Sequence, residues 1–220
     1  RVKKEKADIG LAFDGDADRC FLIDEAGGLV NPSALTALIA ARELKANPGA
    51  SIIYNLISSK AVPEVIAENG GVGIRSRVGH SYIKSMMAET GAVFGGEHSG
   101  HFYFNDFWRA DSGMLAALYA LAELMGSNSS LSELLKPYNR YISSGEINTK
   151  VKDVTKSISR VRDKYHGKYQ VDELDGLTIT ASTWWFNLRP SNTEPLLRLN
   201  VEADTEKEMI KIRDAVLALI

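Results

Sequence analysis

Short apolar runs that resemble strands alternate with amphipathic segments that resemble helices from Asn31 onward. Neighbouring parallel strands need long crossover connections, which helices supply, so this alternation predicts an α/β domain with a mixed, mostly parallel sheet covered by helices. The expected elements are a helix from 31 to about 47, a strand over 51–56, a helix over 61–68, a strand over 72–74, a helix over 81–89, a strand over 92–94 and a helix over 114–125.

The polar run Gly126–Ser130 interrupts this pattern, and a further helix over Leu131–Tyr141 leads to an expected boundary near Ser143. A smaller α+β domain should follow, with Thr205 and Glu208 in capping-box spacing at its last helix. Its other expected elements are a strand over 146–151, a helix over 154–165 and strands over 177–180, 184–188 and 196–202. The expected domains are 1–28, the end of a truncated α/β domain, then 29–142 and 143–220.

A loop near the start of the chain places three carboxylates at alternate positions, Asp14, Asp16 and Asp18, followed directly by Arg19. Carboxylates this close repel one another unless a cation lies among them, and oxygen-only ligation suits a hard divalent ion such as Mg²⁺. An arginine beside a metal ion is favourable when an anion such as phosphate bridges both. We therefore expect a magnesium site that faces a phosphate.

Two other interpretations of this loop exist. Counted from Asp14, it resembles a calcium-binding EF-hand loop with Glu25 at its twelfth position, but the sixth position is Arg19 in place of glycine and the flanks are strand-like. The second alternative is a solvated acidic turn that closes a β-hairpin, which Gly15 would favour.

The sequence Asp-Gly-Asp-Ala-Asp-Arg at 14–19 resembles the metal loop of the α-D-phosphohexomutases, in particular the bacterial phosphomannomutase/phosphoglucomutase enzymes. The resemblance implies that Asp14, Asp16 and Asp18 hold Mg²⁺ against a phosphoserine, and that Arg19 stands beside the phosphoryl group as a catalytic residue. It also implies a hexose 1,6-bisphosphate that acts as intermediate and activator. We call residues 14–19 the metal loop.

A second motif, Arg77–Ser81, joins an expected strand to an expected helix and contains His80. The amides at a helix N-terminus favour an anion, and a histidine there could position phosphate or transfer a proton near neutral pH. A surface histidine without a function is the alternative. The resemblance places this segment, here called the His80 loop, in the active-site cleft.

A third motif, Gly95–His101, offers one carboxylate, one hydroxyl and two imidazoles among small residues, which is a suitable set for gripping sugar hydroxyls. A zinc site is the competing interpretation, although the residue order is not that of a zinc protease. The resemblance makes this segment a sugar-recognition loop, here called the sugar loop, of the mannose/glucose type. The predicted substrate contacts are Glu97, His98, Ser99 and His101.

A fourth motif, Arg189–Pro195, is a polar turn between two apolar strands. Its guanidinium, hydroxyl and amide groups suit a phosphate dianion, and the resemblance assigns phosphate binding to Arg189, Ser191, Asn192 and Thr193. An ordinary hairpin loop is the alternative. We call residues 189–195 the phosphate loop.

The sequence also departs from the family pattern. A lysine expected late in the first parallel strand is replaced by Ile57, with Lys60, Arg75 or Arg77 as candidate substitutes. Asn200 replaces an arginine on the strand after the phosphate loop, where Arg198 lies on the same strand face. The serine nucleophile motif Thr/Ser-Ala-Ser-His-Asn-Pro does not occur in the sequence.

These motifs predict the C-terminal part of a mutase that interconverts hexose 1-phosphate and 6-phosphate, with mannose or glucose as the sugar. Missing N-terminal domains would carry the serine, so this chain alone should be inactive. The alternatives are a non-catalytic sugar-phosphate-binding module, a phosphoglucosamine mutase and a calcium-stabilised structural protein.

Net charge and cysteine content indicate which partners and which compartment to expect for the protein. The formal net charge of -2 gives no reason to expect nucleic acid or a membrane surface as partner. The single cysteine, Cys20, lies in an apolar strand and predicts a reducing compartment, the cytoplasm.

Overall fold

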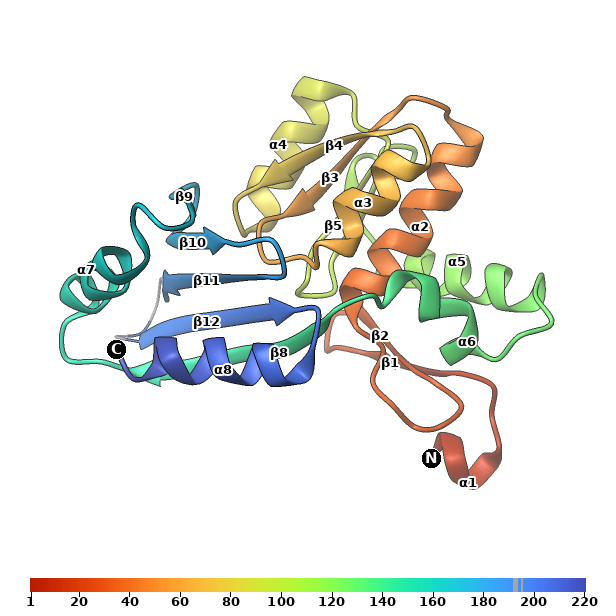
Figure 1. Cartoon of the computed structure of the whole chain (residues 1–220). Helices are drawn as coiled ribbons and strands as arrows, with labels where there is room; N and C mark the ends of the chain where they lie inside the picture. Colours follow the sequence, from red (N-terminus) through yellow and green to blue (C-terminus); the bar gives the residue numbers. More distant parts are fainter. Residues whose placement is uncertain (192–193, 195) are drawn as a thin grey trace. The chain divides into compact units, whose positions relative to one another are not determined.

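The computed structural model describes residues 1–191, 194 and 196–220 of the chain. It divides into two compact units, Arg1–Arg140 and Tyr141–Ile220, which are described separately below. Figure 1 labels their helices and strands. Among the described residues, no helix combines the length and the apolar character that crossing a membrane requires.

The first unit is built on a five-stranded mixed sheet with the strand order β4-β3-β5-β6-β7. The strands are β3 (Ser51–Asn55), β4 (Val72–Ser76), β5 (Phe94–Gly96), β6 (Phe102–Phe104) and β7 (Ala110–Asp111). β3 pairs in parallel with both β4 and β5, whereas β5 with β6 and β6 with β7 are antiparallel pairs. The predicted α/β class with a mixed sheet is therefore confirmed.

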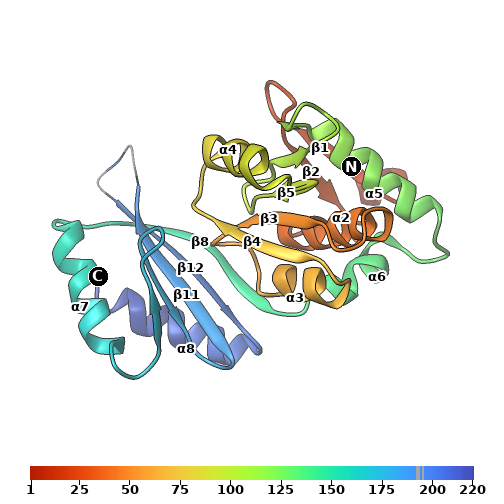
Figure 2. The ribbon, with the colours of Figure 1, turned by 90° about the horizontal axis from the view of Figure 1, so that it is seen from above.

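Helices cover both faces of this sheet, because successive residues of a strand point to opposite sides. Ile52 packs into a core with side chains of α2 (Pro32–Ala46), α3 (Ala61–Glu68) and α5 (Gly113–Met125). Ile53 packs on the other side with α4 (His80–Thr90). In Figure 2, α4 lies on one side of the sheet, and α2 and α3 lie on the other.

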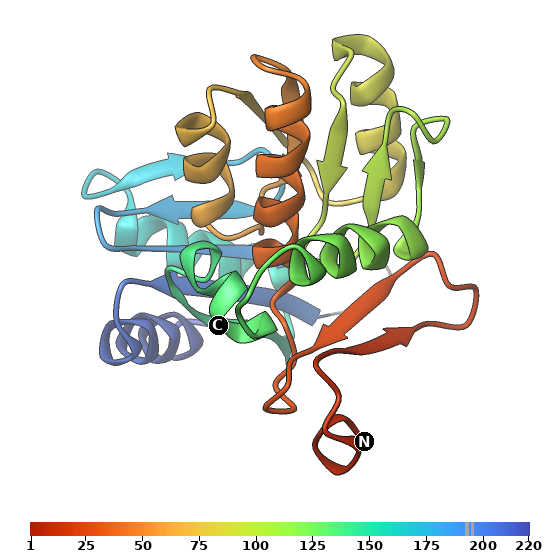
Figure 3. The same ribbon diagram turned by 90° about the vertical axis from the view of Figure 1, so that its right-hand side faces the viewer.

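A two-stranded antiparallel hairpin, β1 (Gly10–Phe13) with β2 (Cys20–Ile23), completes the first unit. Cys20 and Leu22 of β2 are buried in the same core as α2 and α5, and Figure 3 shows α5 beside the hairpin. A short helix, α1 (Val2–Glu5), precedes the hairpin and was not expected.

The helix predicted over Leu131–Tyr141 is shorter than expected. It consists of α6 (Leu131–Leu135) and a 3₁₀ turn, Lys136–Tyr138. Ser130 and Glu133 form a capping box at the start of α6. Pro137 lies within the 3₁₀ turn and lacks the backbone N–H that a continuing α-helix would need, which accounts for the early end.

The second unit is an antiparallel five-stranded sheet with two helices, α7 (Val154–Tyr165) and α8 (Glu206–Leu217). The strand order is β8 (Ile142–Lys150), β12 (Leu196–Ala203), β11 (Trp184–Pro190), β10 (Leu177–Thr180) and β9 (Gln170–Asp172). Val161 of α7 and Met209 of α8 pack with Leu188, Leu199 and other apolar side chains in one core. The predicted smaller C-terminal α+β domain is confirmed, with β9 as an additional strand.

Candidate functional site

Polar residues lie at, or directly after, the carboxyl ends of the three parallel strands of the first unit. Asn55 is the last residue of β3, the His80 loop follows β4, and Glu97 comes directly after β5. In sheets of this kind, the carboxyl ends of parallel strands form the edge at which ligands bind. The three segments therefore lie at the edge where a binding site is expected.

Glu97 connects several of the residues at this edge. It is buried, with 2% of its surface exposed. Its carboxylate accepts hydrogen bonds from Tyr103 Oη at 2.7 Å, the Gly79 backbone N–H at 3.1 Å and Asn55 Nδ2 at 3.3 Å. Burial, together with the neighbouring Glu97 charge, raises the pKa of Tyr103, so that its hydroxyl stays protonated and donates. Glu97 thus joins the His80 loop to the sugar loop. Whether it also contacts a sugar stays a prediction.

His80 is the first residue of α4 and is exposed. The predicted helix began one residue later, at Ser81. Gly79 precedes His80 with a φ of 133°, a backbone conformation that side-chain-bearing residues rarely adopt. The first turn of α4 therefore presents backbone amides and an accessible imidazole together, which is a suitable place for an anion.

The metal loop connects β1 to β2, and Asp14, Asp16 and Asp18 each offer a carboxylate oxygen within 4.8 Å of those of the other two. Burial, reinforced by the neighbouring carboxylates, raises the pKa of Asp18 despite the opposing effect of His101. An all-oxygen donor set with excess negative charge fits a hard divalent cation such as Mg²⁺.

Arg19 lies on this carboxylate cluster. Its Nε is 2.6 Å from Asp14 Oδ2, and its backbone N–H donates to Asp14 Oδ1 at 3.2 Å. Burial raises the pKa of Asp14, but the Arg19 hydrogen bonds outweigh it and hold that pKa below its ordinary value. The guanidinium predicted to face a phosphoryl group thus neutralises Asp14 in this structure.

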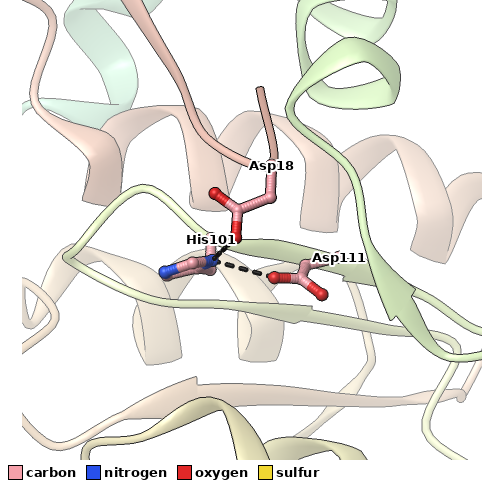
Figure 4. A group of neighbouring side chains, drawn as sticks. All are labelled: Asp18, His101 and Asp111. Atoms are coloured by element: carbon pink, nitrogen blue, oxygen red, sulfur yellow. Dashed lines mark hydrogen bonds and ion pairs between the residues drawn. The ribbon is translucent and has the colours of Figure 1, made fainter. Parts of the chain in front are cut away.

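The metal loop and the sugar loop meet at His101, as Figure 4 shows. The distance from His101 Nδ1 to Asp18 Oδ2 is 3.8 Å, and the distance from the same nitrogen to Asp111 Oδ2 is 2.9 Å. The other ring nitrogen points away from both carboxylates. Two motifs separated by about eighty residues in the sequence are therefore adjacent in the first unit.

Asp111 on β7 was not predicted from the sequence, nor was its partner Lys84 on α4. Lys84 Nζ lies 2.8 Å from Asp111 Oδ1. Burial raises the pKa of Asp111, but the Lys84 hydrogen bond, with further help from His101, holds it below the ordinary value. The sequence signal that could have pointed to Asp111 is its position immediately before Ser112, the N-cap of α5.

His98 and Ser99 lie between Glu97 and His101, and both are half-buried. His98 Nδ1 is 3.2 Å from Ser33 Oγ, which also accepts the Ser59 backbone N–H at 3.0 Å. His98 is thereby tied to the start of α2. The two histidines of the sugar loop have different partners, which does not favour the zinc interpretation.

The phosphate loop belongs to the second unit. Arg189 near the end of β11 is buried, and its Nη2 lies 2.8 Å from Glu146 Oε2. Ser191 is half-buried, and its Oγ lies 3.5 Å from Arg198 Nη2. The predicted contacts Asn192 and Thr193 lie outside the described residues.

The substitutes considered for the family's lysine have partners of their own. Ile57 is buried, with 5% of its surface exposed. Lys60 Nζ lies 3.7 Å from Glu64 Oε1, and the Arg77 guanidinium lies 5.2 Å from the centre of the Tyr82 ring. Arg77 remains the candidate nearest in sequence to His80.

Comparison with protein families supports the same picture. Residues 31–141 match the model "Phosphoglucomutase/phosphomannomutase, alpha/beta/alpha domain III", and residues 146–219 match "Phosphoglucomutase/phosphomannomutase, C-terminal domain". A phosphomannomutase of Methanocaldococcus jannaschii is 48% identical over 208 residues, which cover 94% of this chain and 46% of the relative. The chain spans about half the length of the curated relatives it matches.

Solved structures of phosphohexomutases superpose on this chain. A phosphoglucomutase/phosphomannomutase family protein from Burkholderia thailandensis superposes with a TM-score of 0.88 and 32% identity, over 99% of this chain and 47% of that one. An Aspergillus fumigatus N-acetylphosphoglucosamine mutase, solved with GlcNAc-6P and magnesium, shares the fold alone, with a TM-score of 0.71 and 14% identity over 95% of this chain and 48% of that one. The chain belongs to the α-D-phosphohexomutase family, in which it corresponds to the phosphoglucomutase/phosphomannomutase domain III and C-terminal domain.

Proposed function

We propose that this chain forms the metal-, sugar- and phosphate-binding half of a phosphohexomutase acting on mannose or glucose phosphates in the cytoplasm. The complete enzyme interconverts hexose 1-phosphate and hexose 6-phosphate through a phosphoserine and a hexose 1,6-bisphosphate. The observation that carries this proposal is the 3.8 Å approach of Asp18 in the metal loop to His101 in the sugar loop. It brings a cation site and a sugar-gripping loop together where a phosphoryl group would be transferred.

Asp14, Asp16 and Asp18 would hold the Mg²⁺ ion, and their donor chemistry fits it. When bound, the ion would neutralise charge on the transferring phosphoryl group. Arg19 now serves as the counter-charge of Asp14. Once those carboxylates have a cation, its guanidinium can turn to phosphoryl oxygens, for which its forked geometry is suited.

The sugar loop would orient the sugar ring of the substrate. His101 Nδ1 lies 2.9 Å from Asp111 Oδ2, which fixes the ring so that its other nitrogen, Nε2, is the one that would hydrogen-bond to a sugar hydroxyl. Ser99 and His98 add half-buried polar groups beside it. The Glu97 carboxylate orders the loop by accepting three hydrogen bonds. Glu97 is also proposed as a sugar contact.

His80 in the first unit and the phosphate loop in the second unit each offer groups suited to phosphate. His80 stands at a helix N-terminus, where it can position a phosphate or transfer a proton. Arg189, with Ser191, Asn192 and Thr193, anchors the phosphate that is not being transferred. Holding that phosphate fixes the sugar so that its free hydroxyl meets the phosphoryl donor.

A calorimetric titration of the chain with mannose 1-phosphate and glucose 1-phosphate, each with and without Mg²⁺, tests this proposal. We expect binding that survives removal of Mg²⁺ and that Arg189→Ala weakens at least about tenfold. Arg213→Ala, which removes a surface arginine paired with Asp214 on α8, should bind like the parent. Binding unaffected by Arg189→Ala, or absent from the parent, would contradict the proposed phosphate anchor.

A further inference from the structure

One imidazole nitrogen of the first unit faces two carboxylates that come from different segments. His101 Nδ1 lies 2.9 Å from Asp111 Oδ2 and 3.8 Å from Asp18 Oδ2, and Figure 4 shows the three side chains together. Each residue offers one ligand atom, and these atoms lie within 4.8 Å of one another. The three residues therefore form a donor set of one nitrogen and two oxygens, which the proposed function does not use as a set.

The spacing and the chemistry of these atoms suit a transition-metal ion. Zn²⁺ binds histidine nitrogen and carboxylate oxygen at about 2.0–2.2 Å, so two ligands of one tetrahedral ion lie roughly 3.3 Å apart. The distances of 2.9 and 3.8 Å from His101 Nδ1 lie on either side of this value, so shifts of roughly half an ångström would complete the set. Mg²⁺ prefers oxygen ligands alone, whereas an imidazole nitrogen suits Zn²⁺ and its neighbours. Three protein ligands leave the fourth position of the ion for water.

Two contacts around the set favour a bound cation. Lys84 Nζ lies 2.8 Å from Asp111 Oδ1, the other oxygen of that carboxylate, and so holds Oδ2 toward His101. Outer contacts that orient a ligand in this way are typical of metal sites. Within the described part of the chain, the buried Oδ1 atom of Asp18 has no hydrogen-bond partner, and Arg19 Nε is 3.7 Å from it. A cation bound by Asp18 can compensate this buried oxygen.

The surroundings of the set carry an excess of negative charge. In the described chain, the ion pairs of these carboxylates bring in two permanent cations, Arg19 and Lys84. A neutral His101 then leaves two uncompensated charges among the four carboxylates of Asp14, Asp16, Asp18 and Asp111. One divalent cation balances this excess, so two such ions at the same place are unfavourable.

We propose that Asp18, His101 and Asp111 bind a transition-metal ion such as Zn²⁺, and that this ion excludes Mg²⁺ from the metal loop because both need Asp18. The site differs from the zinc site considered for the sugar loop, since it uses one histidine and takes its carboxylates from two other segments. Its effect on Mg²⁺ rests on the proposed function. On binding, His101 Nδ1 releases its proton to solvent and gives its lone pair to the ion, while Nε2 takes up a proton, so the ring stays neutral.

The test is a calorimetric titration of the metal-free 220-residue chain with ZnCl₂, with and without excess MgCl₂. His101→Gln and Asp111→Asn each remove one proposed Zn²⁺ ligand, whereas Asp16→Asn changes only the Mg²⁺ set. The matched control is His166→Gln, which removes an exposed histidine at the end of α7. In parallel, ¹⁵N NMR of the histidine rings reports which nitrogen binds the ion, and thermal unfolding shows whether each variant is folded.

We expect His101→Gln and Asp111→Asn to weaken Zn²⁺ binding at least about a hundredfold, because each removes a ligand. Lys84→Gln removes only the contact that orients Asp111 and should weaken it about tenfold. Asp16→Asn and His166→Gln should bind Zn²⁺ within a few-fold of the parent. Excess Mg²⁺ should weaken Zn²⁺ binding in the parent and much less in Asp16→Asn. In the NMR spectrum, Zn²⁺ should convert His101 to the form that is protonated on Nε2.

The contrary outcomes are distinct. If Zn²⁺ changes the signals of other histidines but not of His101, or if His101→Gln binds Zn²⁺ like the parent, the site is overturned. If Zn²⁺ binds through His101 and Mg²⁺ does not compete, the sharing of Asp18 is overturned. A chain that binds Zn²⁺ through His101 but does not bind mannose 1-phosphate would contradict the proposed function and support this site alone.

Discussion

The backbone N–H of Gly79 donates a hydrogen bond to Glu97 Oε1 over 3.1 Å. This bond joins the loop after β4 to the loop after β5, and it lies directly beside His80. Since Glu97 is buried and also bonded to Tyr103 and Asn55, the His80 loop is held by the same carboxylate that orders the sugar loop. The positions of the two predicted substrate-facing loops are therefore coupled.

Replacing Gly79 with alanine should weaken this coupling. The φ of 133° disfavours a side chain, and an added Cβ would lie 3.3 Å from Tyr82 Cδ2. We expect a loss of about 1 to 3 kcal/mol in the free energy of unfolding, measured by urea denaturation. Gly49→Ala is the control, because Gly49 has a φ of 80° and open space around its Cβ position. Equal losses in the two variants would contradict a special role for the Gly79 contact.

Mg²⁺ should stabilise the chain through the metal loop. Asp16→Asn removes one charge from the cluster of Asp14, Asp16 and Asp18, so the increase in melting temperature on adding Mg²⁺ should largely disappear. Asp8→Asn removes an exposed carboxylate outside the loop and should keep the parent's response. A Mg²⁺ response that persists in Asp16→Asn and vanishes in Asp8→Asn would place the ion elsewhere.

Asp111 should determine which ring nitrogen of His101 carries the proton. The 2.9 Å contact favours a hydrogen on Nδ1, which ¹⁵N NMR of the histidine ring detects directly. In Asp111→Asn the amide can donate as well as accept, so we expect the Nδ1-protonated form to lose its dominance. Lys84→Gln leaves the Asp111 carboxylate in place and should preserve that form. An unchanged His101 spectrum in Asp111→Asn would show that Asp111 does not orient the ring.

Acid should weaken the attachment of Arg140 to α3. Arg140 forms two hydrogen bonds of 2.6 Å with Glu68, and these bonds hold the pKa of Glu68 below its ordinary value of 4.5, against the opposing effect of burial. A carboxylate with a lowered pKa adds stability above its unfolded-state pKa and loses that contribution as pH falls through its folded-state pKa. Urea unfolding between pH 7 and pH 3 should therefore show a smaller acid-induced loss for Glu68→Gln than for the parent. Glu206→Gln, a substitution of an exposed glutamate on α8, should follow the parent.

Much of the fold was predictable because its signals are local. The cap and proline at Asn31-Pro32 mark the start of α2, and Thr205 accepts the Glu208 backbone N–H at the start of α8 as expected. The expected reciprocal contact from Glu208 is replaced, because its carboxylate accepts a hydrogen bond from Thr183. Thr183, which is distant in sequence, therefore takes the contact with the Glu208 carboxylate that local spacing had assigned to the helix cap.

The candidate site was predictable only in part, because its contacts depend on tertiary structure. The motifs of the metal loop and the sugar loop were visible in the sequence, but the partners Asp111 of His101 and Glu146 of Arg189 lie on other strands. Neither carboxylate belongs to a recognisable motif. Asp111 is part of a two-residue strand, β7, which is too short to produce a periodic pattern.

The central claim is that this chain is the binding half of a phosphohexomutase, and a chimera tests it most directly. The part of the Methanocaldococcus jannaschii phosphomannomutase that lies upstream of the 208 residues 48% identical to this chain would be joined to residues 1–220. Conversion of mannose 1-phosphate to mannose 6-phosphate would then be measured with Mg²⁺. We predict conversion that Asp16→Asn abolishes and Asp8→Asn leaves intact. A folded chimera that binds mannose 1-phosphate but forms no mannose 6-phosphate would contradict the account.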